Sequence, residues 1–296
     1  MIYHNPLGWF KLLFSLKHNE ILKALAKPLL FIALYTALMV FLEDTLINLD
    51  VFKDFKHHVD KGLPELTKVL QLLGFVLSLL LLFRTNTAYD RWWEGRKLWG
   101  SIVNDSRNLA LKISQMNFSQ EEKDEFAKLI SYFAISAKEH LRQNKDCIDD
   151  FELNPEELNY VSKDKHQPLG FITLLRTKIG NQINTEERLS IEQNLNGLID
   201  SLGGCERIRN TPIPSSYSEF FKKFIISYVF ILPIGFVVHF QFFAIVLATF
   251  FFYILVSVEM LAEEIEDPFG DDPNDLPLDG ICMTIQNNCK QILSNP

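Results

Sequence analysis

The sequence has few cysteines and none of the short motifs that mark common catalytic sites. Its four cysteines are Cys147, Cys205, Cys282 and Cys289, and no two form a C-x-x-C pair. This argues against a disulfide framework or a structural zinc cluster and favours reduced thiols. The sequence also lacks G-x-x-x-x-G-K-[ST], G-x-G-x-x-G and H-E-x-x-H. No set of residues points to catalysis, so we do not expect an enzyme.

Basic charge is also scarce. The chain of 296 residues has 29 Lys and Arg against 37 Asp and Glu, which gives a net charge of −8. Nucleic-acid binders usually show a basic surface, so no nucleic-acid partner is expected. The first ten residues, MIYHNPLGWF, lack the basic start of a cleavable signal peptide. We find neither an alternating strand pattern nor an internal repeat, and therefore predict an all-α fold.

What the sequence has in abundance is uncharged apolar runs, which predict a membrane protein. These runs are Pro28–Leu42, Leu72–Phe83 and Phe224–Val258. A spanning helix needs about 20 apolar residues, and the first two runs reach that length with their flanks. The third run would be about 52 Å long as one helix, so we predict a helical hairpin that turns at Val238–Gln241. The four predicted spans are 25–43, 66–84, 221–238 and 241–260.

The charges beside these runs predict the orientation in the membrane. Basic residues precede the first span, follow the second and precede the third, whereas the loop between the first two spans is acidic. Cytoplasmic loops are enriched in Lys and Arg. We therefore predict a multi-pass protein of the cell (inner) membrane with both termini in the cytoplasm. The basic flanks are Lys11, Lys17, Lys23, Lys27, Arg84, Arg91, Arg96, Lys97, Lys222 and Lys223.

The polar region between spans two and three predicts a cytosolic helical bundle. Ser119 with Glu122 fits a capping box that opens a helix to about Arg142. A second capping box, Asn184 with Glu187, predicts a helix that Gly203-Gly204 ends near Leu202. The segment 144–166, with Asn154-Pro155, is expected to be a loop or a short helix with loops.

The helix of span two should continue into the cytosol through RTNTAYDRWWEGRKLWG. Only Gly74 and Gly95 oppose a helix between Leu72 and Trp99. On this extension, we expect the charged residues to form salt bridges between helices. They are Asp90, Arg91 and Glu94.

Span two carries a regular apolar stripe. Phe75, Leu79 and Phe83 follow one another at intervals of four residues and so share one face of a helix. Spacing alone leaves two interpretations open. The stripe either faces lipid or a neighbouring helix, or it lines a narrow apolar pore formed by several copies. Apolar constrictions can gate ion flow by dewetting.

An acidic segment follows the last span. Eight acidic residues and no basic residue lie between Met260 and Asp279. A run of like charges is usually a solvated tail, but the prolines and Gly270 in this segment favour turns. Clustered carboxylates on a turn suit calcium, which takes six to eight oxygen ligands. Both interpretations remain open from composition alone.

Three segments of the chain together resemble the bestrophin family of ion channels. They are FVLSLLLLFRTNTAYDRWWEGRKLWG, CERIRNTPIPSSYSEF and AEEIEDPFGDDPND, and they occur in the family order. The form R-T-N-T-A-Y-D-R-W-W resembles the prokaryotic branch. The resemblance implies a single channel domain over residues 1–296, with a cytosolic helical region at about 85–220 and an acidic C-terminal segment at 261–296. It also implies a homopentamer with four transmembrane helices per subunit, embedded in membrane lipid around one central pore.

The resemblance also implies roles for individual residues. Three apolar residues of the second transmembrane helix form the pore neck in this family, and by position they are Phe75, Leu79 and Phe83. A second, cytosolic constriction falls near Gln182 and Glu186. Calcium is a possible rather than a required cofactor, because animal members bind it in a clasp near the membrane. The clasp maps onto carboxylates of Asp272 and Asp275 and carbonyls near Glu264, Asp267 and Tyr3, with Pro273 and Asn274 in place of acids.

The sign of the conducted ion stays open from the sequence. The resemblance implies passive conduction of small monovalent ions, either chloride and other anions or sodium and potassium. Edges of Phe rings pointed into a pore would favour anions, whereas ring faces would favour cations. A membrane-anchored enzyme and a secondary transporter remain as alternatives, although paired broken helices typical of transporters are absent from the sequence pattern.

Overall fold

A computed structural model of the chain describes residues 20–47, 53–144, 148–149, 151–162, 166–180 and 182–294. In these ranges the regular secondary structure is helical and no strand is present, which confirms the all-α prediction. The chain divides into two compact units. The membrane unit comprises the described residues up to Asn86 together with Ile213–Glu263, and the bundle unit comprises Thr87–Pro212 and the described residues from Glu264 onward.

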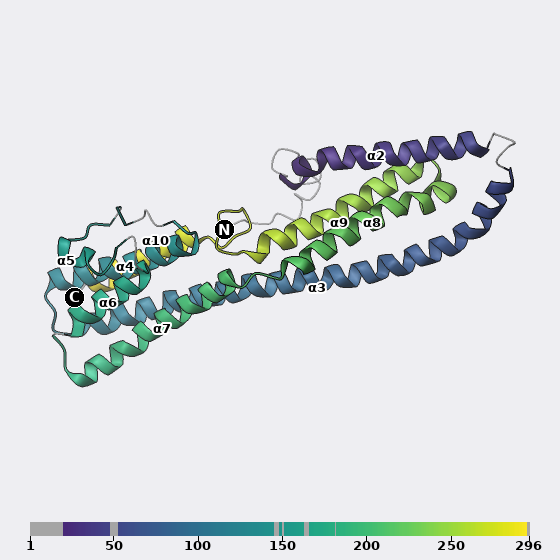
Figure 1. Ribbon diagram of the computed structural model, residues 1–296. Coiled ribbons are helices and arrows are strands. Elements are labelled where there is room, and N and C mark those ends of the chain that lie inside the picture. Colours follow the sequence, from purple (N-terminus) through teal and green to yellow (C-terminus); the bar gives the residue numbers. More distant parts are fainter. Residues whose placement is uncertain are drawn as a thin grey trace, which may run out of the picture. The chain divides into compact units, whose positions relative to one another are not determined.

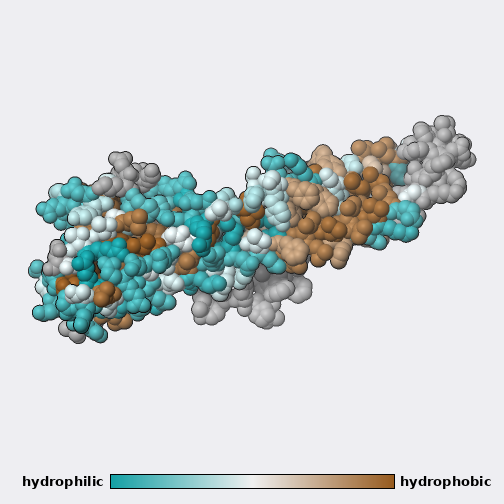
Figure 2. Space-filling view, turned by 60° about the horizontal axis from the view of Figure 1, so that its bottom comes forward, coloured by the Kyte–Doolittle hydropathy of each residue, from teal (hydrophilic) through white to brown (hydrophobic). Residues whose placement is uncertain are grey.

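The membrane unit contains the four predicted spans (Figure 1). They lie in α2 (Glu20–Ile47), α3 (Lys53–Ser114), α8 (Ser215–Phe240) and α9 (Phe243–Glu266). Each of these helices has a stretch long and apolar enough to cross a membrane. Figure 2 shows apolar side chains gathered on the surface of this unit. Large exposed apolar surfaces of this kind mark membrane or partner contacts rather than a water-facing fold.

Helices α8 and α9 form the predicted hairpin. Between them Gln241 has a positive φ of 46° with ψ of −123°, and its N–H donates to the Val237 carbonyl at 2.9 Å. These angles lie outside the right-handed helical region, so the helix ends here. The turn therefore lies at the end of the predicted interval. Pro233 lies within α8 and does not end it.

Helix α3 is continuous over 62 residues, which confirms the predicted continuation of span two beyond Arg84 and shows a helix longer at both ends than expected. Neither glycine in its central part interrupts it. A Cβ atom at Gly74 would lie 2.5 Å from the Tyr228 hydroxyl in the membrane unit, and one at Gly95 would lie 3.1 Å from the Phe269 ring in the bundle unit. Both positions are therefore close-packing sites, at which any larger residue would collide with a neighbouring aromatic side chain.

The bundle unit consists mainly of four helices that pack with the C-terminal part of α3. They are α4 (Gln120–Leu141), α6 (Gln167–Gly180), α7 (Thr185–Asn210) and α10 (Leu278–Ser294), and α4 contacts each of the other three. Their shared core includes buried Trp99, Phe126, Phe133 and Phe171. The described cysteines of this unit are free and buried, and burial raises the pKa of each thiol to about 12.

Capping boxes open the bundle helices as the sequence indicated. Ser119 and Glu122 exchange side-chain and backbone hydrogen bonds at the start of α4, and Asn184 with Glu187 does the same for α7. A third box, Asn154 with Glu157, opens the short helix α5 (Pro155–Leu158). The Asn-Pro pair therefore begins a helical turn, which agrees with the expected short helix in this region.

The predicted end of α7 at Gly203-Gly204 is wrong, because α7 continues to Asn210. A Cβ atom at Gly204 would lie 2.7 Å from a methyl carbon of Leu98 on α3. The glycine thus permits close packing of α7 against α3. A mid-helix glycine costs only about 1 kcal/mol relative to alanine, which burial of the surrounding apolar side chains can offset. The helix ends instead just before Pro212, since the residue before a proline disfavours helical geometry.

Candidate functional site

The predicted neck residues lie on the exposed face of α3. Phe75, Leu79 and Phe83 are exposed to 61%, 39% and 59% respectively. Successive helix residues are rotated by about 100°, so Phe75 and Leu79 each lie about 160° around the axis from Leu77. Leu77 is fully buried within the membrane unit. The other residues that α3 buries in this unit share its side of the helix: Leu70, Leu81 and Arg84.

This placement satisfies a necessary condition for a pore-lining stripe. A side chain buried inside its own subunit could not face an axis shared by several copies. The same exposure also suits contact with lipid, since Leu72 and Leu82 beside the stripe are exposed as well. The neck therefore stays a prediction, now with a defined face of α3.

A buried ion pair lies directly beside the stripe. Arg84, the residue after Phe83, places its guanidinium Nε 3.5 Å from a carboxylate oxygen of Glu259 on α9. Both side chains are buried in the membrane unit. Charged groups in a spanning region are rare and usually paired, because desolvation is costly.

Sequence reasoning assigned Arg84 only to the basic flank of span two and did not predict its burial or its ion pair. The signal for the pair was present, because Arg84 and Glu259 are the first charges after the apolar runs Leu72–Phe83 and Phe224–Val258. That they face each other depends on tertiary packing, which the spacing does not reveal.

Arg91, which opens the R-W-W motif, binds backbone carbonyls. Its guanidinium donates to the carbonyls of Ile208 at 2.6 Å, Thr211 at 2.8 Å and Glu266 at 3.1 Å. The first two close the C-terminal end of α7, and the third is the last residue of α9. Helix C-termini leave carbonyls unsatisfied and carry partial negative charge. Arg91 therefore joins two helix ends within the bundle unit, whereas the sequence predicted a salt bridge.

Glu94 does form the salt bridge expected of it. A guanidinium nitrogen of Arg207 lies 2.9 Å from its carboxylate. The pair is largely exposed, and exposed pairs of this kind contribute about 0–1 kcal/mol. It is therefore a minor contact between α3 and α7.

The D-P-F-G segment is held by the R-W-W motif and by α4. The indole N–H of Trp92 donates to the Asn274 carbonyl at 3.0 Å, and Phe269 packs over Gly95. From α4, Arg142 donates to the Gly270 carbonyl at 3.1 Å and forms an ion pair with Asp271 at 2.9 Å. Two of the three segments that carry the family resemblance thus lie against one another, and the end of the acidic segment is ordered rather than a free tail.

The carboxylate of Asp275, one of the predicted clasp ligands, forms a hydrogen bond within the acidic segment itself. Its Oδ2 accepts the Asp272 N–H at 2.8 Å, while its Oδ1 is buried with no hydrogen-bond partner among the described residues. The pKa of Asp275 is raised to about 6. Burial is the largest cause, and nearby acidic side chains add to it, whereas the hydrogen bond from the Asp272 N–H lowers the pKa. These neighbours are Asp272, Asp267 and Glu264.

The carboxylates around Asp275 favour a bound cation but do not provide a complete set of ligands. A buried carboxylate oxygen without a partner, among acidic neighbours, would be stabilised by a bound cation. However, the Glu264 carboxylate already accepts the Asn274 amide at 3.0 Å. Among the described residues, these acidic side chains do not form a set of three mutually close ligands. Tyr3 lies outside the described residues, so calcium remains a prediction.

The residues of the predicted second constriction lie between α6 and α7. Gln182 follows α6 in a turn, where its N–H donates to the Ile179 carbonyl at 3.1 Å. Glu186 lies in the first turn of α7. Both are exposed, so they can face a solvent-filled space, and their role in conduction stays a prediction.

Comparison with known proteins agrees with this arrangement of motifs. The family described as Bacterial/Fungal Bestrophin protein matches residues 1–291. A voltage-dependent anion channel-forming protein of Nostoc sp. is 34% identical over 97% of this chain and 92% of its own length. The voltage-dependent anion channel-forming protein YneE of Escherichia coli K12 is 28% identical over 99% of this chain and 94% of its own.

Solved structures show the same fold. A bacterial bestrophin homologue from Klebsiella pneumoniae matches with a TM-score of 0.78 and 23% identity, over 91% of this chain and 99% of that one. Another structure of a Klebsiella pneumoniae homologue gives a TM-score of 0.72 and 26% identity, over 90% and 99% of the two chains. The chain is thus a helical membrane protein and belongs to the bacterial and fungal bestrophin family, which consists of ion channels rather than enzymes.

Proposed function

We propose that the chain forms a homopentameric channel that conducts small monovalent anions, chloride foremost, passively across the membrane. Five copies of α3 would surround one axis, with the stripe of Phe75, Leu79 and Phe83 as the neck. The observation that carries this proposal is the position of the stripe, which lies on the face of α3 opposite the side buried in its own subunit.

Anions are favoured over cations by two considerations. Relatives at 28–34% identity are named voltage-dependent anion channel-forming proteins. In addition, two rings of phenylalanines can turn their positive edges toward a passing anion. The acidic segment argues for the opposite selectivity, because carboxylates near a pore mouth would raise the local concentration of cations.

The two alternative functions fare differently. Family membership argues against a membrane-anchored enzyme. Flux measurements can distinguish a secondary transporter from a channel, because a transporter would couple the movement of one solute to that of another. A channel passes ions down their gradient without such coupling.

We place the protein in the cell (inner) membrane with both termini and the bundle unit in the cytoplasm. The basic residues that flank the spans support this orientation. In that arrangement Gln182 and Glu186 would form a second, cytosolic constriction. Both positions are exposed, and the Gln182 side chain also forms a hydrogen bond with Glu122.

We also propose that calcium binds to the acidic segment, with Asp275 and Asp272 as its side-chain ligands. The support is the partnerless Oδ1 of Asp275 and the acidic groups around it. When bound, calcium would supply a positive charge that stabilises the ionised form of Asp275. Binding can be measured by calorimetry on the purified protein, where Asp275→Asn should remove the heat of binding and Asp149→Asn, a change distant in sequence, should not.

The test of function is the reversal potential of purified protein in a planar bilayer under a KCl gradient, with and without calcium. We expect reversal toward the chloride potential and a particle mass of five chains. Reversal toward the potassium potential would overturn anion selectivity while retaining the channel. Uptake of chloride into vesicles that requires a second solute gradient, without single-channel currents, would favour a transporter instead.

A further inference from the structure

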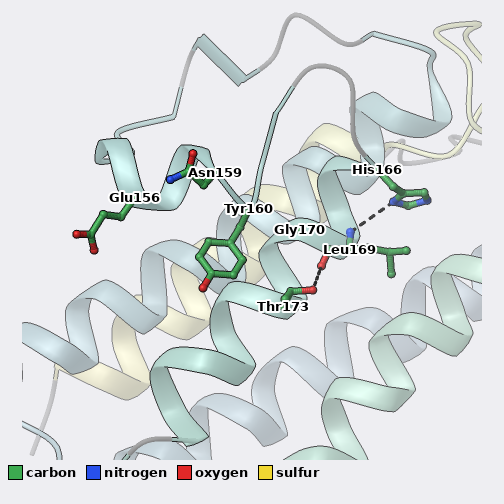
Figure 3. A pocket seen from close by; sticks show the side chains of 7 residues that line it. All are labelled: Glu156, Asn159, Tyr160, His166, Leu169, Gly170 and Thr173. Carbon is green, nitrogen blue, oxygen red and sulfur yellow. Dashed lines mark hydrogen bonds between the residues drawn. The ribbon is translucent and has the colours of Figure 1, made fainter.

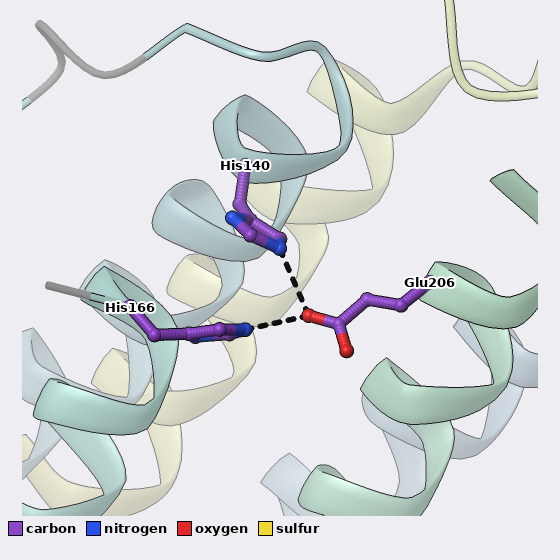
Figure 4. Close-up of side chains that lie close together, drawn as sticks. All are labelled: His140, His166 and Glu206. Carbon is purple, nitrogen blue, oxygen red and sulfur yellow. Dashed lines mark hydrogen bonds and ion pairs between the residues drawn. The ribbon is translucent and has the colours of Figure 1, made fainter. Parts of the chain in front are cut away.

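Two histidines and a glutamate, from two helices and the residue before a third, converge in the bundle unit (Figure 4). His140 lies in the last turn of α4, His166 immediately precedes α6, and Glu206 lies on α7. The Nε2 atoms of His140 and His166 lie 2.8 Å and 2.6 Å from the same carboxylate oxygen of Glu206. The three residues are far apart in the chain, so their spacing in the sequence gives no sign of this cluster.

The two imidazole rings lie close together. Their ring centroids are only 4.3 Å apart. Burial, and then the neighbouring His166, lower the pKa of His140, while Glu206 opposes this shift and Arg209 adds to it. The Arg209 guanidinium also donates to the His140 carbonyl at 2.9 Å. A neutral imidazole offers a nitrogen lone pair to a metal ion.

The three ligand atoms are close enough to share one ion. They lie within 4.8 Å of one another. Zinc bonds to histidine nitrogen and carboxylate oxygen at about 2.0–2.2 Å. To place an ion between these atoms, each nitrogen needs to move away from the Glu206 oxygen by only a fraction of an ångström. Two histidines and one carboxylate form a known zinc set that leaves a coordination position for water.

An ion can reach these residues from solvent. Each of the three side chains retains about a third of its exposure, from 27% to 34%. His166 also lines a cleft of about 680 Å³ together with Tyr160 and Leu169 (Figure 3). Figure 3 shows the other ring nitrogen of His166, Nδ1, accepting the Leu169 N–H at the start of α6.

Metal binding would break the hydrogen bond between the Leu169 N–H and His166 Nδ1. With a metal on Nε2, the ring proton must move to Nδ1, and the bond from the Leu169 N–H is lost. The bond is long, at 3.4 Å, compared with about 2.7–3.2 Å for ordinary N–H···O hydrogen bonds. Its loss is therefore small beside the gain of a metal–nitrogen bond.

We propose that His140, His166 and Glu206 form a binding site for a divalent transition metal, and that the bound ion fixes the end of α4 and the start of α6 against α7. Glu206 is followed within a single turn by Ile208, whose carbonyl Arg91 binds. The ion would therefore stabilise the part of α7 that is joined to the R-W-W motif. The competing interpretation is a hydrogen-bonded cluster that closes the bundle without a metal.

The test is equilibrium binding of Zn²⁺ to the detergent-solubilised full chain, measured against a chromophoric chelator and by the rise in melting temperature. Glu206→Gln keeps an acceptor oxygen for the histidines but removes the charge. His166→Asn keeps a side chain that caps helix N-termini well but removes the ligand nitrogen. The control is His57→Gln with His58→Gln, which removes an adjacent histidine pair elsewhere in the chain.

We expect one tight Zn²⁺ equivalent per chain, at least about a tenfold loss of affinity in each site variant, and no change in the control. Without metal, each variant should melt within error of the parent, which separates loss of a ligand from loss of fold. The proposal is overturned if the site variants bind Zn²⁺ as the parent does, if the control abolishes binding, or if the parent binds no Zn²⁺. Cobalt provides a spectroscopic check, since nitrogen ligation in the parent should give visible bands that His166→Asn removes.

Discussion

The Arg84 guanidinium lies 3.5 Å from the Glu259 carboxylate, with both side chains buried among the membrane-spanning helices. Removing one partner leaves the other as an uncompensated buried charge, which costs about 3–5 kcal/mol. We therefore expect Glu259→Leu to lower the melting temperature of the solubilised protein sharply. The double variant Arg84→Leu with Glu259→Leu should recover most of this loss, because no unpaired charge remains.

The matched control is the pair of Lys222 and Glu263, which lie 2.8 Å apart in the same unit with both side chains about half exposed. Exposed pairs contribute about 0–1 kcal/mol, so Glu263→Leu should shift the melting temperature little. Equal effects of Glu259→Leu and Glu263→Leu would contradict the assignment of a buried, energetically important pair.

Gly74 is expected to tolerate no side chain, because a Cβ atom there would lie 2.5 Å from the Tyr228 hydroxyl and 3.2 Å from its ring carbon. Overpacking of this kind costs about 1–3 kcal/mol. We predict that Gly74→Ala destabilises the protein in thermal unfolding by that amount. Adding Tyr228→Phe removes the colliding oxygen and should restore part of the stability.

Gly62 on the same helix provides the comparison, since a Cβ atom there meets no heavy atom of the described residues within 4 Å. Alanine is a better helix former than glycine by about 1 kcal/mol. Gly62→Ala should therefore be neutral or stabilising. If Gly74→Ala behaved in the same way, α3 and α8 would not be in close contact at this position.

Asp275 should make the stability of the protein depend on pH. Its pKa is raised from 3.8 to about 6 by burial and acidic neighbours. The neutral acid is therefore favoured in the folded state, so its stabilising contribution is complete below about pH 4 and is lost as pH rises through about 6. In a calcium chelator, Asp275→Asn should stabilise the protein at pH 7.5 by about 1 kcal/mol, less than the full shift implies because the segment is near solvent.

The same substitution should have little effect at pH 4.5, where Asp275 itself is largely protonated in the folded state. Thermal unfolding at both pH values gives the comparison. A greater stability of the parent over Asp275→Asn at pH 7.5 without calcium would show that the carboxylate has a favourable partner, contrary to its surroundings in this structure.

How much of this architecture follows from the sequence depends on whether the signal is local. The apolar runs predicted four spans, and the capping boxes at Ser119 and Asn184 predicted the starts of α4 and α7 correctly. These features arise from residues a few positions apart. Continuity of α3 through Gly74 and Gly95 was also predictable, because single glycines weaken a long helix without ending it.

The features that were missed depend on residues distant in the chain. Gly204 was interpreted as a helix end, whereas it faces Leu98 on α3. Arg91 was expected in a salt bridge, whereas it satisfies carbonyls at the ends of α7 and α9. A glycine or an arginine has the same local signature in either role. Only the packed helices decide between them, because they determine which groups lack a partner.

The neck stripe offers the most direct test of function. If Leu79 and Phe83 line the narrowest part of the pore, truncation to alanine widens an apolar constriction and weakens the barrier that dewetting imposes on ions. We expect Leu79→Ala and Phe83→Ala each to raise single-channel conductance severalfold or to prolong opening in planar bilayers. The change should be largest when both are combined, because the two positions lie one helical turn apart on the same face.

Two exposed apolar residues on other helices serve as size-matched controls. Leu34 on α2 is 61% exposed and Phe250 on α9 is 55% exposed, close to Phe83 at 59%. If Leu34 and Phe250 are exposed because they contact lipid, Leu34→Ala and Phe250→Ala should leave conductance unchanged. Wild-type currents in both neck variants would mean that the stripe faces lipid or a neighbouring subunit. Increased currents in the control variants would mean that the pore axis lies beside another helix.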